Sequence, residues 1–161
     1  MKLIYIGKLV NTHGLKGEVR IISDFEYKEK LFIKGIHLYI GKDKEEVTIE
    51  SYRPHKMFDM CTFKEYGYIN DVLKFKGQNV YANREELELD ANELLDSDYI
   101  SLRCIYKEKT IGYIEEVIDN NGYKLFNING KYIPKNENFI EKIDLENKTI
   151  YLKNLEGLIW K

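Results

Sequence analysis

The chain has 161 residues, 43% of them hydrophobic, which is enough apolar material for one domain or two small ones and excludes global disorder. Its net charge of -2 argues against a strongly basic nucleic-acid-binding protein. The charge is uneven, because residues 1–84 carry 15 basic and 11 acidic residues whereas residues 85–161 carry 10 and 16, which suggests two faces with different partners.

The two cysteines, Cys61 and Cys104, are far apart in the sequence and form no CxxC pair. No apolar run approaches the roughly 18 residues of a membrane-spanning helix, and the first residues lead into a strand-like run rather than a signal peptide. We therefore expect a cytoplasmic protein with reduced thiols and no membrane association. A structural disulfide between the two cysteines is the less favoured alternative.

Apolar and alternating runs predict that the first half is a β-barrel of about six strands. One short helix is expected over residues 70–77, with Asn70 as its N-cap and Gly77 as its C′ residue. Pro54 should end a strand or mark a sheet edge, because it cannot donate to a ladder. The expected strands cover residues 3–10, 18–22, 37–40, 47–53, 57–63 and 79–82.

The loop between the first two expected strands combines an imidazole, an ammonium and a guanidinium with two glycines. Bare backbone amides next to cationic side chains suit an anionic surface such as phosphate, although Gly14 and Gly17 would also serve simply to shape a turn. A second basic cluster, residues 53–56, would lie near this loop in a closed barrel; the alternative is two separate, solvated clusters. The candidate binding residues are His13, Gly14, Leu15, Lys16, Gly17, Arg20, Arg53, His55 and Lys56.

Residues 84–98 mark a sharp change in composition, with seven acidic residues against one arginine. Four leucines among them suggest a linker that is docked on a domain surface, with the domain boundary near residue 90. We accordingly expect three parts in the chain. They are an N-terminal domain over residues 1–84, an acidic linker over residues 85–97 and a C-terminal domain over residues 98–161.

The second half also predicts about six short strands, enough for a second small barrel. Turn signals at residues 120–122 and at residues 129–130 separate some of them. The apolar end of the chain, residues 155–160, is expected to pack on a domain. The predicted fold class is therefore all-β, with two small β-barrels and one or two short helices. The expected strands cover residues 101–106, 112–118, 124–128, 131–133, 139–143 and 149–152.

Motifs for catalysis and metal binding are missing from the sequence. His13, His37 and His55 have no companion at metal-ligand spacing, and no GxSxG, HExxH, P-loop or GxGxxG motif is present. Cys61 lies in a strand-like run and is interpreted as a buried apolar residue. We therefore expect no catalytic residue, no metal and no cofactor. The alternative is an enzyme acting on RNA with His13 or His55 as a general base.

Residues 7–20, GKLVNTHGLKGEVR, closely resemble the N-terminal signature of the ribosome maturation factor RimM family. The resemblance continues in the same order through residues 52–56, 67–71, 77–81, 133–134, 143–145 and 156–158. Residues 98–104 depart from the family's pattern. They retain only Tyr99 of an aromatic pair that the family follows with Asp-Leu-Ile-Gly.

The resemblance implies an N-terminal barrel like those of translation factors and a C-terminal PRC barrel. It implies a monomeric, non-enzymatic assembly factor that binds the head of the small ribosomal subunit and supports processing of its rRNA. The implied contacts are one head ribosomal protein, S nineteen, and nearby small-subunit rRNA. Tyr99 is the candidate contact to that protein, or alternatively an inter-domain packing residue. A general RNA-binding β-barrel protein without ribosome specificity is the other interpretation.

We further expect the acidic half of the chain to face the basic ribosomal protein and the basic loop to face RNA phosphate. This assignment combines the uneven charge with the implied partners. It is our own hypothesis rather than a property implied by the resemblance.

Overall fold

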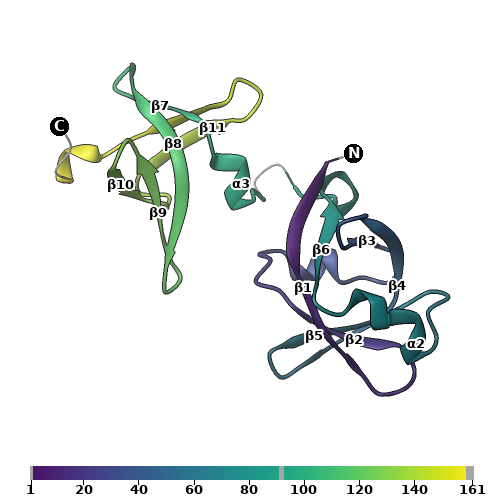
Figure 1. The fold of residues 1–161 in the computed structure, drawn as a ribbon. Coiled ribbons are helices and arrows are strands. Elements are labelled where there is room, and N and C mark those ends of the chain that lie inside the picture. The colour runs from purple at the N-terminus through teal and green to yellow at the C-terminus, as the bar shows by residue number, and fades with distance from the viewer. Residues whose placement is uncertain (1, 91–92, 159–161) are drawn as a thin grey trace. The chain divides into compact units, whose positions relative to one another are not determined.

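The computed structural model describes residues 2–90 and 93–158, and the chain divides into two compact units, Met1–Asn92 and Glu93–Lys161. Both units consist mainly of strands with a few short helices, which confirms the all-β prediction (Figure 1). None of the helices in the described ranges is long and apolar enough to cross a membrane.

The first unit is a sheet of six strands whose hydrogen bonds close into a ring, in the order β1-β2-β5-β4-β3-β6. Two strands, β1 and β4, extend to 11 residues and are longer than the sequence predicted. Pro54 lies inside β4 rather than at its end. Pro54 pairs with Asp59 of β5 on one side, but the pairing of β4 with β3 on the other side stops at Thr48. Proline is tolerated there because this part of β4 has a strand neighbour on one side only. The strands are β1 (Leu3–His13), β2 (Glu18–Ile22), β3 (His37–Ile40), β4 (Glu45–His55), β5 (Phe58–Phe63) and β6 (Gln78–Asn83).

The interior of the ring is filled by the alternate apolar residues of its strands. Val19 and Ile21 are fully buried, whereas Glu18 and Arg20 lie half-buried on the opposite face of β2, as the alternation predicts. Cys61 of β5 is part of this core as a free thiol, and its burial raises the pKa of that thiol. The interpretation of Cys61 as a small buried apolar residue therefore agrees with its position.

The helix expected over residues 70–77 forms in two consecutive pieces. The predicted N-cap, Asn70, is wrong, because the helix begins one residue after Tyr68, whose N–H donates to the Asp71 carboxylate at 3.1 Å. Gly77 follows the C-terminal cap with a φ of +82°, the left-handed conformation expected at C′. The helical segments of this unit are α1 (Lys28–Leu31), α2 (Ile69–Val72) and the 3₁₀ helices η1 (Leu73–Phe75) and η2 (Arg84–Leu87).

The acidic segment after β6 is bound to the first unit. The Glu86 carboxylate contacts Nδ1 of His37 at 2.7 Å, Asp90 contacts Nζ of Lys30 at 3.6 Å, and Leu87 is buried in the core. The uneven charge of the sequence therefore does not separate the two units. The first unit carries 15 basic and 15 acidic residues, and the second carries 10 and 12.

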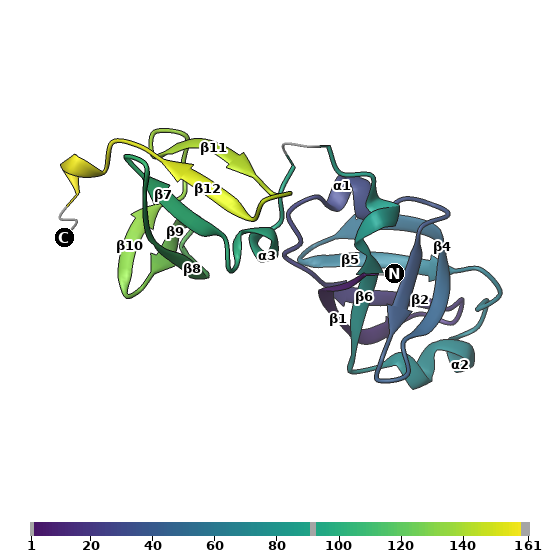
Figure 2. The same cartoon turned by 90° about the horizontal axis from the view of Figure 1, so that it is seen from above.

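The second unit is a six-stranded sheet in the order β10-β9-β8-β7-β12-β11. All of its pairs are antiparallel except that of β7 with β12, which runs parallel (Figure 2). A short helix, α3 (Asp96–Tyr99), precedes the first strand. The strands are β7 (Arg103–Tyr106), β8 (Lys109–Asn120), β9 (Tyr123–Ile128), β10 (Lys131–Pro134), β11 (Ile140–Asp144) and β12 (Thr149–Leu152), followed by the 3₁₀ helix η3 (Leu155–Gly157).

The core of the second unit forms around Phe126 and Ile128, both fully buried. Cys104 belongs to the same core as a free thiol, and burial raises its pKa to about 12. Leu155 and Leu158 pack against this core, as expected for the apolar end of the chain. The remaining part of that prediction, residues 159–160, lies outside the described residues.

Candidate functional site

Two hairpins of the first unit lie side by side because β2 pairs with β5 (Figure 1). Arg20 of β2 is paired with Met60 of β5, and the ring centroids of His13 and His55 lie 6.1 Å apart. The fold therefore brings His13 and Arg20 of one predicted basic cluster close to Arg53 and His55 of the other, whereas the turns that carry Lys16 and Lys56 lie at opposite ends of the β2–β5 pair. We call this surface the hairpin face and define it by His13, Lys16, Glu18, Arg20, Arg53, His55 and Lys56.

Arg20 is held in place on the hairpin face by two neighbours. Its Nη2 atom donates to Nδ1 of His13 at 2.7 Å, and its guanidinium lies over the ring of Phe58 at 5.4 Å from the centroid. Because a guanidinium can only donate, Nδ1 of His13 is the acceptor, and a neutral His13 carries its proton on Nε2. Arg20 is thus partly a structural residue that fixes the orientation of the imidazole.

Arg53 is joined to Glu18 by two parallel hydrogen bonds of 2.8 Å each. This bond is the main cause that lowers the pKa of Glu18, with smaller contributions from the nearby imidazoles of His13 and His55. Glu18 was not among the predicted site residues, although it lies inside the same motif. Its carboxylate neutralises Arg53 and leaves the hairpin face less positive than its basic residues alone suggest.

The most accessible cations of the hairpin face are Lys16 and Lys56, which are both exposed and form no ion pair within the described residues. Lys56 occupies the turn between β4 and β5 with a φ of +58°. Each lysine has an exposed apolar neighbour in the chain: the side chain of Leu15 is 75% exposed and that of Met57 is 69% exposed. The hairpin face therefore offers two exposed ammonium groups, each next to an apolar side chain in the sequence.

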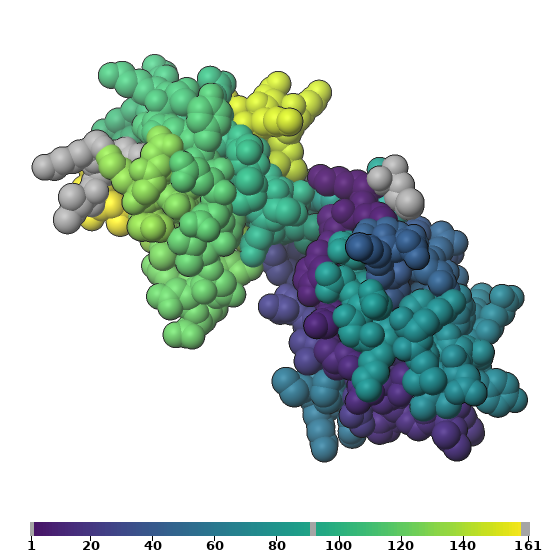
Figure 3. Space-filling model, viewed as in Figure 1, coloured from purple at the N-terminus to yellow at the C-terminus, as the bar shows by residue number. Residues whose placement is uncertain are grey.

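The two glycines of the loop have different roles. Both have positive φ, but a Cβ on Gly17 would lie 2.2 Å from the carbonyl oxygen of Tyr66, whereas a Cβ on Gly14 would meet nothing within 4 Å. The same loop accepts a hydrogen bond of 2.9 Å from the N–H of Ile69 at the carbonyl of Leu15. In Figure 3 the purple surface of the first hairpin accordingly adjoins the teal surface of the α2 segment.

A groove of about 510 Å³ adjoins this loop, with Lys16 in its wall. Tyr68 also lines it, with a side chain that is 73% exposed. Its charged rim combines Lys16 and Lys64 with three carboxylates, those of Glu50, Glu65 and Asp71. The groove therefore has no dominant sign of charge.

Tyr99, the predicted contact to a ribosomal protein, lies in the core of the second unit with 7% exposure. Its ring centroid is 5.1 Å from that of Phe126, and Nζ of Lys135 lies over the ring at 4.6 Å. The aromatic ring is thus packed within its own unit rather than presented on its surface. The residue was selected by resemblance alone, which carries no information about burial.

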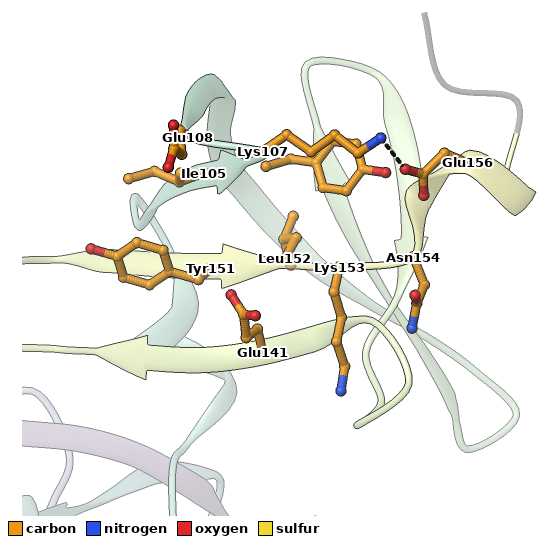
Figure 4. A pocket seen from close by; sticks show the side chains of 10 residues that line it. Ile105, Lys107, Glu108, Glu141, Tyr151, Leu152, Lys153, Asn154 and Glu156 are labelled. Carbon is orange, nitrogen blue, oxygen red and sulfur yellow. Dashed lines mark ion pairs between the residues drawn. The ribbon is translucent and has the colours of Figure 1, made fainter.

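The second unit also has a pocket of about 390 Å³ between the β7–β8 turn and the strands β11 and β12 (Figure 4). Lys107 and Glu156 form an ion pair across one end, and the bond from Lys107 lowers the pKa of Glu156 to about 2. Glu141 and Tyr151 line the rest, together with Lys153. The wall contains charges of both signs, and none of the predicted site residues lies there.

The described residues contain no group of three or more His, Cys, Asp and Glu side chains that could hold a metal ion. His13 and His55 form the imidazole pair of the hairpin face, while His37 is separately engaged with Glu86. The hairpin face itself offers charge attraction and hydrogen bonding.

Comparison with known proteins assigns both units. Residues 4–87 match the RimM N-terminal domain family, and residues 96–158 match the RimM PRC barrel domain family. Proteins named ribosome maturation factor RimM are 34% identical to this chain in Exiguobacterium sp., over 99% of this chain and 98% of the relative, and in Shouchella clausii, over 95% of each. The solved N-terminal domain of RimM from Thermus thermophilus aligns with 55% of this chain and 98% of its own, at 19% identity and a TM-score of 0.47. The chain therefore belongs to the RimM family of ribosome maturation factors.

Proposed function

We propose that this protein is a non-enzymatic assembly factor for the head of the small ribosomal subunit, including support of small-subunit rRNA processing. It acts in the cytoplasm as a monomer and binds a basic head ribosomal protein, S nineteen, together with nearby small-subunit rRNA. The observation that carries the proposal is the family match, which covers both units and extends over almost the full length of relatives named as ribosome maturation factors.

The hairpin face supports an RNA contact by the first unit. Lys16 and Lys56 are exposed ammonium groups, and the Arg20 guanidinium adds a third positive charge. Phosphate contacts of this kind position a protein on RNA without reading its sequence. The negative charge of Glu18 offsets only the positive charge of Arg53, since the two side chains are hydrogen-bonded to each other. RNA binding by this face would consequently be weakened by salt.

The proposed mechanism is a shift of populations. A factor that binds the correctly arranged head more tightly than its competitors increases the fraction of subunits in that arrangement. No nucleotide-binding motif is present in the sequence, so we expect release when later contacts of the growing subunit replace those of the factor. Two units with different surfaces suit this task, because each can hold a different component of the same assembly intermediate.

Sedimentation of a cell lysate tests the proposal. The chain should migrate with immature small subunits and be absent from mature subunits and from the bulk of other RNA. The matched control is the same gradient at high salt, which should release the chain because its RNA contacts are electrostatic. An even distribution over all RNA would instead favour a general RNA-binding barrel without ribosome specificity.

A further inference from the structure

Three strands of the second unit, β8, β9 and β10, are neighbours in the sheet (Figure 1), and their outer side carries aromatic side chains. Phe126 and Ile128 of β9 are fully buried, so the alternate residues Leu125 and Asn127 point to the opposite, outer side. Cross-strand partners share a face of a sheet, and Asn127 is paired with Tyr132 of β10. The outer side is therefore identified by the pairing of residues between strands, and not only by the exposure of their side chains.

Three tyrosines project from this outer side, and each is more than half exposed. Tyr113 is 53% exposed, Tyr123 is 56% exposed and Tyr132 is 52% exposed. An apolar row runs between them across the three strands, because Ile118 and Pro134 both pair with Leu125. We call this surface the tyrosine face and define it by Tyr113, Ile118, Tyr123, Leu125, Tyr132 and Pro134.

The charged side chains beside the tyrosine face are mainly acidic. Strand β8 contributes two exposed carboxylates: Glu115 lies at a bulge in the pairing with β9, and Glu116 accepts a hydrogen bond from Asn127 at 3.1 Å. One exposed cation, Arg103 of β7, is the cross-strand partner of Tyr113. Asp119 pairs with Lys124 and therefore lies on the other side of the sheet, where its carboxylate accepts a hydrogen bond from the N–H of Gly122.

The neighbouring lysines do not balance these carboxylates. Lys124 and Lys135 both bond to Asp96, at 2.8 and 2.9 Å. Their charge is therefore directed to α3, away from the tyrosine face. The surface thus combines apolar area with negative charge.

We propose that the tyrosine face is the docking surface for the protein partner of this chain, and that the docked surface is basic, rich in Arg and Lys. This inference rests on the proposed function, because it names the surface that the ribosomal protein would contact. Tyrosine buries a large ring at little entropic cost and is enriched among the residues that dominate binding energy at protein interfaces. Its ring also attracts the cations with which Glu115 and Glu116 would pair.

The same features disfavour two other occupants. Exposed tyrosines also stack on RNA bases, but the carboxylates of β8 would repel the phosphates that accompany those bases. A second copy of the chain would place Glu115 and Glu116 opposite the same carboxylates, which costs binding energy through like-charge repulsion. The face is therefore complementary to a basic protein surface rather than to RNA or to itself.

The test uses the full-length chain and immature small subunits isolated from cells that lack it. The variant Tyr113→Ser/Tyr123→Ser/Tyr132→Ser should bind these particles at least about tenfold more weakly than the wild type. Tyr5→Ser is the matched control, since Tyr5 is an equally exposed tyrosine of the first unit at 58%, and it should leave this affinity unchanged. Binding of the triple variant at the wild-type affinity would overturn the inference and leave the proposed function intact.

A photo-crosslinking amino acid at position 123 identifies what lies on the face. A covalent adduct to a basic protein of the particle supports the inference. Adducts to RNA or to a second copy of the chain, or adducts no more abundant than those formed from position 5, would overturn it. Failure of the wild-type chain to bind the particles at all would overturn the proposed function, and the inference with it.

Discussion

The first unit closes its six strands into a ring, whereas the sheet of the second unit ends at β10 and β11 in the part of the chain that is described. Closure gives every described strand of the first unit two hydrogen-bonded neighbours and leaves no free strand edge among them. The first unit accordingly presents side chains from turns and strand ends, as on the hairpin face. The second unit presents the flat outer side of three strands. Two all-β units with six strands each therefore offer different chemistry to their partners.

The largest expected effect is a loss of folding stability that is confined to the second unit. Phe126→Ala removes a fully buried ring from the second unit and should lower its free energy of unfolding by about 3–5 kcal/mol. Hydrogen exchange of peptides from each unit, measured by mass spectrometry, should show faster exchange in residues 93–158 only. Equal acceleration in the first unit would mean that the two units unfold as one. Tyr123→Ala, at an exposed position, is the control that should change neither.

The next effect probes the packing of the first loop. Gly17→Ala should destabilise the first unit by about 2 kcal/mol or more, because its Cβ would collide with the Tyr66 carbonyl and because φ is positive. Gly14→Ala has the same conformational cost without the collision and should lose only about 1 kcal/mol. Urea denaturation of both variants measures the difference. Equal losses would show that the loop does not depend on its contact with Tyr66.

A third prediction concerns binding rather than folding. Lys16→Glu/Lys56→Glu should weaken affinity for small-subunit RNA about tenfold and lower the magnitude of the salt slope by roughly 1.4 to 1.8, as expected for two lost phosphate contacts. Lys42→Glu/Lys76→Glu reverses two other exposed lysines of the same unit and provides the control for net charge. Filter binding over a range of salt concentrations gives both quantities. Identical losses in the two double variants would show that the hairpin face has no special role.

The fourth prediction concerns pH. The bond from Arg53 holds the pKa of Glu18 below its ordinary value of 4.5, so this interaction stabilises the first unit above that pH and is lost as the pH falls through the lowered pKa. Arg53→Met should raise the pKa of Glu18 toward its ordinary value. Nuclear magnetic resonance titration of the Glu18 carboxyl measures this directly. An unchanged titration midpoint would contradict the assignment of Arg53 as the main cause.

The smallest expected effect decides between binding and catalysis on the hairpin face. His13→Gln/His55→Gln should leave rRNA maturation in cells unchanged if the histidines only contribute to docking, because glutamine still offers hydrogen bonds. Loss of maturation while the variant still binds small subunits would favour the alternative of an enzyme with a histidine base. Quantification of precursor and mature small-subunit rRNA provides the measurement.

The strands could be predicted because alternation reports directly on burial, as Glu18 to Ile21 show in β2. The meeting of the two basic clusters was foreseeable only as one alternative, since it depends on the pairing of β2 with β5. Long-range pairs such as the parallel contact of β7 with β12 leave no local signal in the sequence.

Other features could not be read from local patterns because tertiary contacts decide them. Asn70 is a favourable cap residue, yet the helix starts earlier because the Asp71 carboxylate bonds the N–H of Tyr68. Composition predicted a docked linker around Glu86, but the partner of its carboxylate, His37, depends on the tertiary fold. Tyr99 was chosen by resemblance, and only the structure shows that its ring is buried.

The distribution of the two thiols has a practical consequence. Cys61 and Cys104 are each fully buried, in the core of a different unit, and burial raises the pKa of both thiols. A thiol reagent reacts with the exposed thiolate, so modification of each cysteine must wait for its own unit to open. The alkylation rates of the two cysteines can be separated by peptide mapping. Each rate therefore reports how often its own unit opens in the wild-type chain, whether the chain is alone or bound to an assembling particle.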